Sequence, residues 1–175
     1  MGTEAIRRGE LVTPADQDSL EAVQSFVGGY MERLGFPAPA RMQMELAVEE
    51  VFVNIASYAY GPGAGGGPAA ANTVTVRCEA EAGAETAGGR EAGAGAGAEA
   101  GAETAGQAAG GRLTVSFLDS GQPYNPLARE DPDTTLALAE RPIGGLGVFL
   151  IKRLMDEVAY RFEAGQNILT ISKGV

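Results

Sequence analysis

The segment Gly144-Gly-Leu-Gly-Val-Phe-Leu-Ile-Lys-Arg-Leu-Met-Asp-Glu-Val158 places three glycines directly before an apolar run. The run is predicted to form a helix from Leu146 or Gly147 to about Met155. Glycines at a helix start expose successive backbone N–H groups, which can hold a phosphate at the positive helix end. The alternative is a flexible loop with an N-cap glycine. The segment is not a P-loop, because the chain contains no Gly-Lys-Ser/Thr sequence.

Two pairs of residues elsewhere in the chain could serve a ligand. Glu50 and Asn54 are four residues apart, so they share one face of a predicted helix; the alternative is a solvated helix face. Asp119 ends a predicted strand, where its carboxylate could accept a hydrogen bond from an exocyclic amine, and Gly121 would let a flat ring approach the backbone. The commoner meaning of Asp-Ser-Gly is a turn.

Hydrophobic periodicity predicts an order of strands and helices from which the fold class follows. The first helix is expected over 13–35, with Thr13 before Pro14 as its N-cap, and the second over 41–60. Alternating residues predict strands at 10–12, 73–78, 113–118, 158–163 and 168–172. The last two strands would form a hairpin around residues 164–167. Hairpin-linked strands with helices on one face predict an α+β, two-layer sandwich with a mixed, mostly antiparallel sheet.

Residues 79–112 differ in composition from the rest of the chain. They hold 13 Ala and 10 Gly among 34 positions and repeat Glu-Ala-Gly-Ala-Glu-Thr-Ala-Gly at 81–88 and 99–106. Without large apolar side chains, this segment cannot offset the entropy lost on ordering. We interpret it as a disordered, low-complexity expansion of a hairpin loop, within a single domain that spans residues 1–175.

Composition excludes several classes of function. A net charge of −10 without a basic stripe argues against nucleic-acid binding. No apolar run is long enough to span a membrane, and the N-terminus lacks the apolar core of a signal peptide, so a cytoplasmic protein is expected. One cysteine and no histidine exclude histidine-based zinc sites, Ser-His-Asp triads and self-phosphorylation on histidine.

Three motifs, in this order, are more specific than any one of them alone. They are Glu50-x-x-x-Asn54, Asp119-x-Gly121 and Gly145-x-Gly147. The chain resembles the anti-sigma-factor serine/threonine kinases (RsbW-like) of the GHKL ATPase superfamily, from about residue 10 to 173 without the Ala/Gly insert. Leu46-Ala-Val-Glu-Glu-Val-Phe-Val-Asn54 looks like the N-box of that family. Phe117-Leu-Asp-Ser-Gly-Gln-Pro-Tyr-Asn-Pro126 looks like its first glycine box, and the 144–158 segment like its second.

The resemblance implies a Bergerat-type ATP-binding fold and a role for the residues of each motif. Glu50 would be the general base that takes a proton from a serine hydroxyl or a water. Asn54 would place an oxygen on Mg²⁺, which keeps few protein ligands and bridges nucleotide phosphates. Asp119 would bind the adenine amino group, with Gly121 beneath the ring.

The resemblance also assigns the segment before the last predicted helix. Gly144, Gly145 and Gly147 would hold phosphates, and residues 122–143 would form the ATP lid. Arg141, the cation just before the glycines, could touch the γ-phosphate. Tyr58 departs from the pattern, because many members have histidine there.

The function that the resemblance implies is partner switching. The kinase would phosphorylate a STAS-domain antagonist on serine or threonine and would bind a sigma factor or another regulated protein; we also expect a homodimer. One alternative is a nucleotide-dependent module that sequesters a partner without phosphotransfer. A second alternative is the catalytic half of a histidine kinase, which would need a separate histidine-bearing dimerisation segment. A third is another GHKL ATPase.

Overall fold

The computed structural model describes residues 7–60, 72–83, 111–128 and 146–175, and within them five strands and three α-helices. In chain order they are β1 (Arg7–Pro14), α1 (Leu20–Arg33), α2 (Ala38–Asn54), β2 (Thr73–Glu81), β3 (Arg112–Asp119), α3 (Leu146–Leu154), β4 (Glu157–Glu163) and β5 (Gln166–Gly174). This order of strands and helices is the predicted one.

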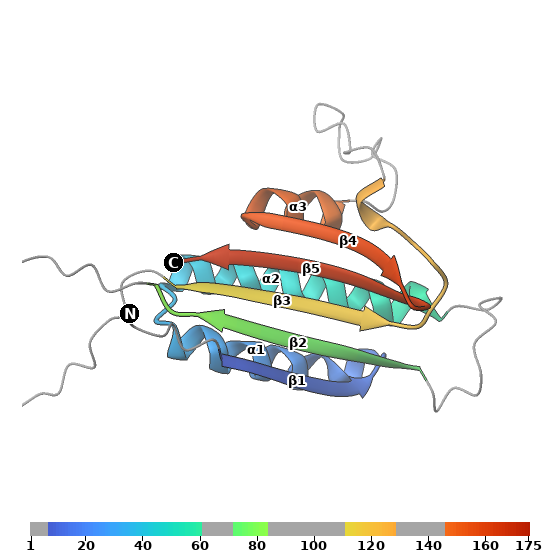
Figure 1. Cartoon of the computed structure of the whole chain (residues 1–175), viewed down its shortest axis with the longest axis horizontal. Helices are drawn as coiled ribbons and strands as arrows, with labels where there is room; N and C mark the ends of the chain where they lie inside the picture. Colours follow the sequence, from blue (N-terminus) through green and yellow to red (C-terminus); the bar gives the residue numbers. More distant parts are fainter. Residues whose placement is uncertain (1–6, 61–71, 84–110, 129–145) are drawn as a thin grey trace, which may run out of the picture.

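The strands form one sheet in the order β1-β2-β3-β5-β4, and the helices pack on one of its faces (Figure 1). The predicted α+β two-layer sandwich is confirmed. The expectation of a mixed sheet is corrected, because all four pairings of the described strands are antiparallel. Hairpins join β2 to β3 and β4 to β5, and antiparallel neighbours need no crossover helix between them.

The core lies between the sheet and the helices. Val74, Val76, Cys78 and Ala80 alternate along β2 and are all buried, as the two-residue period of a strand requires for one covered face. Helices α1 and α2 meet them with apolar residues at 3- and 4-residue spacing. The buried helix residues include Val23, Val27, Met31, Met44, Val48, Val51 and Phe52.

The other face of the sheet carries polar cross-strand pairs. Arg77 Nε lies 2.7 Å from Glu10 Oε2, and the Ser116 and Thr170 hydroxyls are 2.9 Å apart. An antiparallel sheet can keep one face in water in this way.

Two predictions at the start of the chain were wrong in detail. Strand β1 extends through Pro14, which an edge strand tolerates at its end. Thr13 lies in that strand and caps nothing. The capping residue is Asp16, whose side chain accepts a hydrogen bond from the Ser19 N–H at the 3₁₀ turn before α1.

The boundaries of the Ala/Gly insert also change. Strand β2 continues to Glu81 and pairs there with Arg112 of β3, so residues 79–81 and 112 belong to the sheet. Ala80 is buried in the core. Residues 82, 83 and 111 are described outside the strands, and residues 84–110 of the predicted disordered loop lie outside the described residues.

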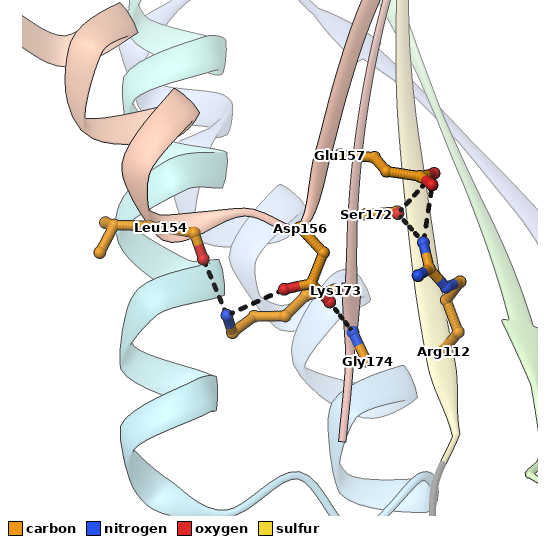
Figure 2. A network of polar contacts seen from close by, with 7 residues as sticks. All are labelled: Arg112, Leu154, Asp156, Glu157, Ser172, Lys173 and Gly174. Carbon is orange, nitrogen blue, oxygen red and sulfur yellow. Dashed lines mark hydrogen bonds and ion pairs between the residues drawn. The ribbon is translucent and has the colours of Figure 1, made fainter.

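A network of polar contacts fixes the C-terminal end of α3 against the sheet (Figure 2). Lys173 of β5 donates to the carbonyl of Leu154, the last residue of α3, at 2.8 Å, and its Nζ lies 3.8 Å from Asp156 Oδ1. The other Asp156 oxygen accepts from the Gly174 N–H at 2.7 Å. A lysine on the last carbonyls satisfies acceptors that the helix leaves open and complements its dipole.

Among the described residues, none of the helices has the length and apolarity needed to cross a bilayer.

Candidate functional site

A cavity of about 660 Å³ opens between α2, α3 and the sheet. This volume lies in the range of about 300–1,000 Å³ that is usual for small-molecule sites. The lining is mostly apolar and includes Val51, Ile55, Val148, Ile151, Val158 and Leu169. A few polar side chains converge on it: Glu50, Asn54, Asp119 and Asn167. An apolar cavity with a few placed polar groups is typical of a small-molecule site, where the polar groups fix the orientation of the ligand.

Asp119 ends β3 at the cavity wall and is 5% exposed. Its Oδ1 accepts from the Gly121 N–H and from Asn167 Nδ2, both at 2.9 Å. No other described residue hydrogen-bonds this carboxylate, so Oδ2 can still accept a hydrogen bond from a ligand. Burial raises the pKa of Asp119, and these two hydrogen bonds oppose that rise.

Asn167 of β5 holds Asp119 in place. It lies directly opposite Asp119 in the sheet, and its Nδ2 donates to Asp119 Oδ1 and to the Gln122 carbonyl. Its Oδ1 accepts from the Tyr160 hydroxyl at 2.7 Å and from the Tyr124 N–H at 3.1 Å. Since Asn167 is 6% exposed and fully hydrogen-bonded, it orients Asp119.

Gly121 has a structural reason to be glycine. A Cβ at this position would overlap the Ala59 carbonyl group and lie 2.8 Å from the Ala59 Cβ. The Gly121 N–H donates to Asp119, so Asp-Ser-Gly does form a turn, and that turn lies at the cavity. The predicted contact of Gly121 with a ring stays a prediction.

Tyr60 braces the same turn. Its hydroxyl accepts from the Ser120 N–H at 3.0 Å and donates to the Thr73 carbonyl at 2.9 Å. Burial raises the pKa of Tyr60, the hydrogen bond from Ser120 opposes this rise, and the charge of Asp119 adds to it. The phenol therefore keeps its proton and ties the end of β3 to the start of β2.

Glu50 and Asn54 lie in the last turns of α2 and both line the cavity. Beyond Asn54 the chain makes a π-helical turn, Ile55–Ala59, a deviation that is frequent at functional sites. Tyr58 in this turn is 75% exposed and lines the cavity too. The two side chains predicted to share a helix face therefore do meet Asp119 around one cavity.

Gly147 lies in the first turn of α3 and lines the cavity beside Glu50. The first part of the predicted lid also borders the cavity, through Pro123, Tyr124, Pro126 and Leu127. The rest of the predicted lid, residues 129–143 with Arg141, lies outside the described residues, and so do Gly144 and Gly145.

The residues at the cavity fit a magnesium ion that is held mainly by a ligand's phosphates. The described residues contain no group of three or more His, Cys, Asp or Glu that could hold a metal alone. Mg²⁺ commonly takes one or two protein oxygens and completes its shell with phosphate and water. Asn54 offers an amide oxygen that no described residue hydrogen-bonds, with the Glu50 carboxylate one helical turn away.

Among the polar residues around Asp119, the sequence-based reasoning missed Asn167, Tyr160 and Tyr60. The predicted hairpin loop covered 164–167 and so placed Asn167 in a turn. In the structure Ala164 and Gly165 alone form the turn, with φ of 52° and 79°, and Asn167 belongs to β5. The available signal was a polar residue in the same alternating row as Leu169 and Ile171.

The fold and the cavity together define an α+β domain with a small-molecule site. A sequence model of the histidine kinase-like ATPase domain family matches residues 13–173. The chain belongs to this family, and the match supports membership of the GHKL-type ATPases and ATP binding. No curated protein matches the chain significantly.

Proposed function

We propose that this chain is an ATP-dependent serine/threonine protein kinase of the anti-sigma-factor type, which phosphorylates a STAS-domain antagonist and sequesters a sigma factor or another regulated protein. The observation that carries the proposal is the position of Glu50: a carboxylate one helical turn from Asn54, at the same cavity as Asp119. Binding alone requires Asp119 and a phosphate site. A carboxylate beside the expected phosphates suits a general base.

The motif residues at the cavity have separate parts in the proposed reaction. Asp119, oriented by Asn167, accepts a hydrogen bond from the adenine amino group. Asn54 holds Mg²⁺, which when bound neutralises charge on the phosphates. The glycines before and within the first turn of α3 hold those phosphates through backbone N–H groups.

The transfer step uses Glu50. The acceptor hydroxyl oxygen bonds to the γ-phosphorus while its proton passes to the Glu50 carboxylate. The bond from that phosphorus to the β,γ-bridging oxygen breaks, and ADP leaves with the electron pair. General-base assistance of this kind contributes about 10²- to 10⁴-fold in rate.

The test is transfer of radiolabel from [γ-³²P]ATP to purified STAS-domain proteins in the presence of Mg²⁺. We expect label that is stable to acid and labile to alkali, as phosphoserine and phosphothreonine are. ATP binding without transfer to any acceptor would instead favour the module that sequesters a partner and transfers nothing.

A gel-filtration measurement with and without ATP tests the proposed homodimer.

A further inference from the structure

At the cavity, the Glu50 side chain of α2 lies against Gly147 of α3. A Cβ built on Gly147 would overlap Glu50 Oε2, and it would lie 2.9 Å from Cδ and 3.5 Å from Cγ. The space that a side chain at position 147 would fill is therefore occupied by the carboxyl group of Glu50.

We propose that Gly147 is a positioning residue for Glu50, and that the first turn of α3 must be glycine here so that the Glu50 carboxyl group can lie against it. The inference rests on the proposed function, in which Glu50 is the base. It assigns Gly147 a task in addition to the phosphate contact expected of its motif.

The contact is not a general property of glycines in this fold. Gly28 in α1 and Gly165 in the β4–β5 turn have no heavy atom within 4 Å of a built Cβ, and Gly121 faces the backbone of Ala59. A Cβ on Gly9 would overlap the Tyr30 hydroxyl, and those on Gly29 and Gly174 would lie at an ordinary 3.5 Å from Arg33 and Asp156. Of these glycines, Gly147 is the one whose Cβ would overlap a carboxylate, and that carboxylate lines the cavity.

Neither helix can move away easily to admit a side chain at position 147. The part of α2 that follows Glu50 is fixed in the core, with Val51 at 1% and Phe52 at 0% exposure. At its other end α3 is held by Lys173 on the Leu154 carbonyl (Figure 2). A nine-residue helix is only about 13 Å long, so an anchored C-terminus limits movement of its first turn.

The end of the Glu50 side chain is consequently the part that would move. Gly147→Ala should therefore leave the fold intact and displace the carboxyl group. Alanine also has the higher helix propensity, so the variant is not expected to unfold. A displacement of about 1 Å at a catalytic group can cost about 100-fold in rate.

Three measurements on the full chain test the proposal. The first is NMR of the Glu50 side chain without nucleotide, using ¹³C-labelled glutamate and Glu50→Gln for assignment. The second is ATP affinity by calorimetry. The third is release of ³²P from [γ-³²P]ATP to water at saturating Mg·ATP, with water as the acceptor. Gly28→Ala is the matched control, since it adds the same methyl group to a helix in open space.

We expect the Glu50 resonances to shift in Gly147→Ala and not in Gly28→Ala. ATP hydrolysis should fall about 10- to 100-fold, while the Kd for ATP stays within about threefold. Because aspartate is one methylene shorter, Glu50→Asp should cost much less in the Gly147→Ala background than in the wild type. Such non-additivity is the sign of direct coupling.

Unmoved Glu50 resonances in Gly147→Ala overturn the positioning role, whatever the activity. A loss of ATP affinity that equals the loss of rate overturns it too, because glycine would then be required by the nucleotide. If Glu50→Gln hydrolyses ATP at the wild-type rate, Glu50 is not the base. The NMR measurement then still tests whether Gly147 positions the Glu50 side chain. The two failures are thus seen in different measurements.

Discussion

The two ends of α3 differ in what their polar groups bind. At the C-terminal end Lys173, Asp156 and the Leu154 carbonyl hydrogen-bond or pair with one another (Figure 2). At the N-terminal end Glu50 and Asn54 line a cavity, and neither side chain has a hydrogen-bond partner among the described residues.

The strands next to α3 repeat this difference. We call the side of the sandwich at the C-terminus of α3, around Lys173 and Arg112, the closed end. There Arg112 Nη1 lies 3.2 Å from Glu157 Oε2 and donates to the Ser172 hydroxyl at 2.6 Å. We call the side with the cavity, at the N-terminus of α3, the open end. There Oδ1 of Asp119 accepts hydrogen bonds from Asn167 and Gly121, while Oδ2 is left for a ligand. Polar groups that satisfy one another stabilise a fold, and groups left unsatisfied at a cavity are suited to binding. Substitutions at the two ends should therefore affect different measurements.

The largest effect is expected from Glu50→Gln at the open end. The amide cannot take the acceptor's proton, so phosphotransfer should fall about 10²- to 10⁴-fold. The affinity for ATP should change little, because the amide is nearly isosteric and the adenine contact is made by Asp119. Radiolabel transfer and an ATP titration on the same preparation measure both. Full phosphotransfer by this variant would show that Glu50 is not the base.

Asp119→Asn should weaken ATP binding by about 10- to 100-fold, since a hydrogen bond to a charged group contributes about 1.5–3 kcal/mol. The amide oxygen of the variant side chain can accept the hydrogen bonds from Asn167 and Gly121. The NH₂ group then points toward the adenine amino group, and two donors cannot hydrogen-bond each other. Calorimetry measures the loss. Tyr160→Phe is the comparison, because it removes a hydroxyl that donates to Asn167 and leaves the Asp119 carboxylate in place.

The same substitution should change how stability depends on pH. Burial raises the pKa of Asp119, so the folded chain holds this proton more tightly than the unfolded chain does. The corresponding stability is complete below the unfolded pKa and is lost as pH rises through the folded pKa. Asp119→Asn has no carboxyl group to titrate, so its free energy of unfolding does not fall in this way. In urea unfolding, the stability of the variant relative to wild type should therefore rise as pH increases from the unfolded pKa to the folded pKa of Asp119. In the wild type, ATP affinity should fall as pH is lowered through the raised pKa. A pH-independent difference in stability between variant and wild type would contradict the assignment.

The sequence was sufficient for the order of the strands and helices, because hydrophobic periodicity is a local feature. Alternation in β2 and 3- and 4-residue spacing in α1 determine which faces are buried, and the described structure confirms them. Glu50, Asn54, Asp119 and Gly147 meet at one cavity because α2, β3 and α3 all end or begin at the same side of the sandwich.

Two contacts could not be predicted, for different physical reasons. The pairing of Asn167 with Asp119 depends on a two-residue turn in which Ala164, a residue other than glycine, adopts a positive φ. The contact between Glu50 and Gly147 depends on how two helices cross, which the sequence of neither helix encodes. The roles of Arg141, Gly144 and Gly145 stay predictions, since these residues lie outside the described part of the chain.

Lys173→Met tests the closed end. Methionine keeps the apolar stem and removes the hydrogen bond to the Leu154 carbonyl, so the free energy of unfolding should fall by about 1 kcal/mol. ATP affinity should be unchanged. Arg161→Met is the matched control: its pair with Glu163 is exposed and should contribute little, about 0–1 kcal/mol. A large change in ATP affinity for Lys173→Met would show that the two ends of α3 are coupled.

The smallest effect is expected from deleting residues 84–110 at the closed end. The ladder of β2 and β3 continues to the pair Glu81–Arg112, so Ala82, Gly83 and Gly111 remain to close the hairpin. A hairpin loop of three residues that contains glycine is a common connection.

Shortening the loop lowers the entropy cost of closure by about 0.6 kcal/mol for each halving of its length. The restricted conformations of a three-residue turn oppose part of this gain, so we expect the free energy of unfolding to stay within about 1 kcal/mol of wild type or to rise slightly. ATP affinity should not change, because Asp119 lies at the opposite end of β3 from Arg112. Urea unfolding and calorimetry on the deletion variant measure both quantities. Arg112→Ala in the full chain is the comparison, since it removes contacts with Ser172 and Glu157 and should destabilise where the deletion does not. A clear loss of stability on deletion would mean that residues 84–110 pack on the domain, and a loss of ATP affinity would mean that they reach the open end.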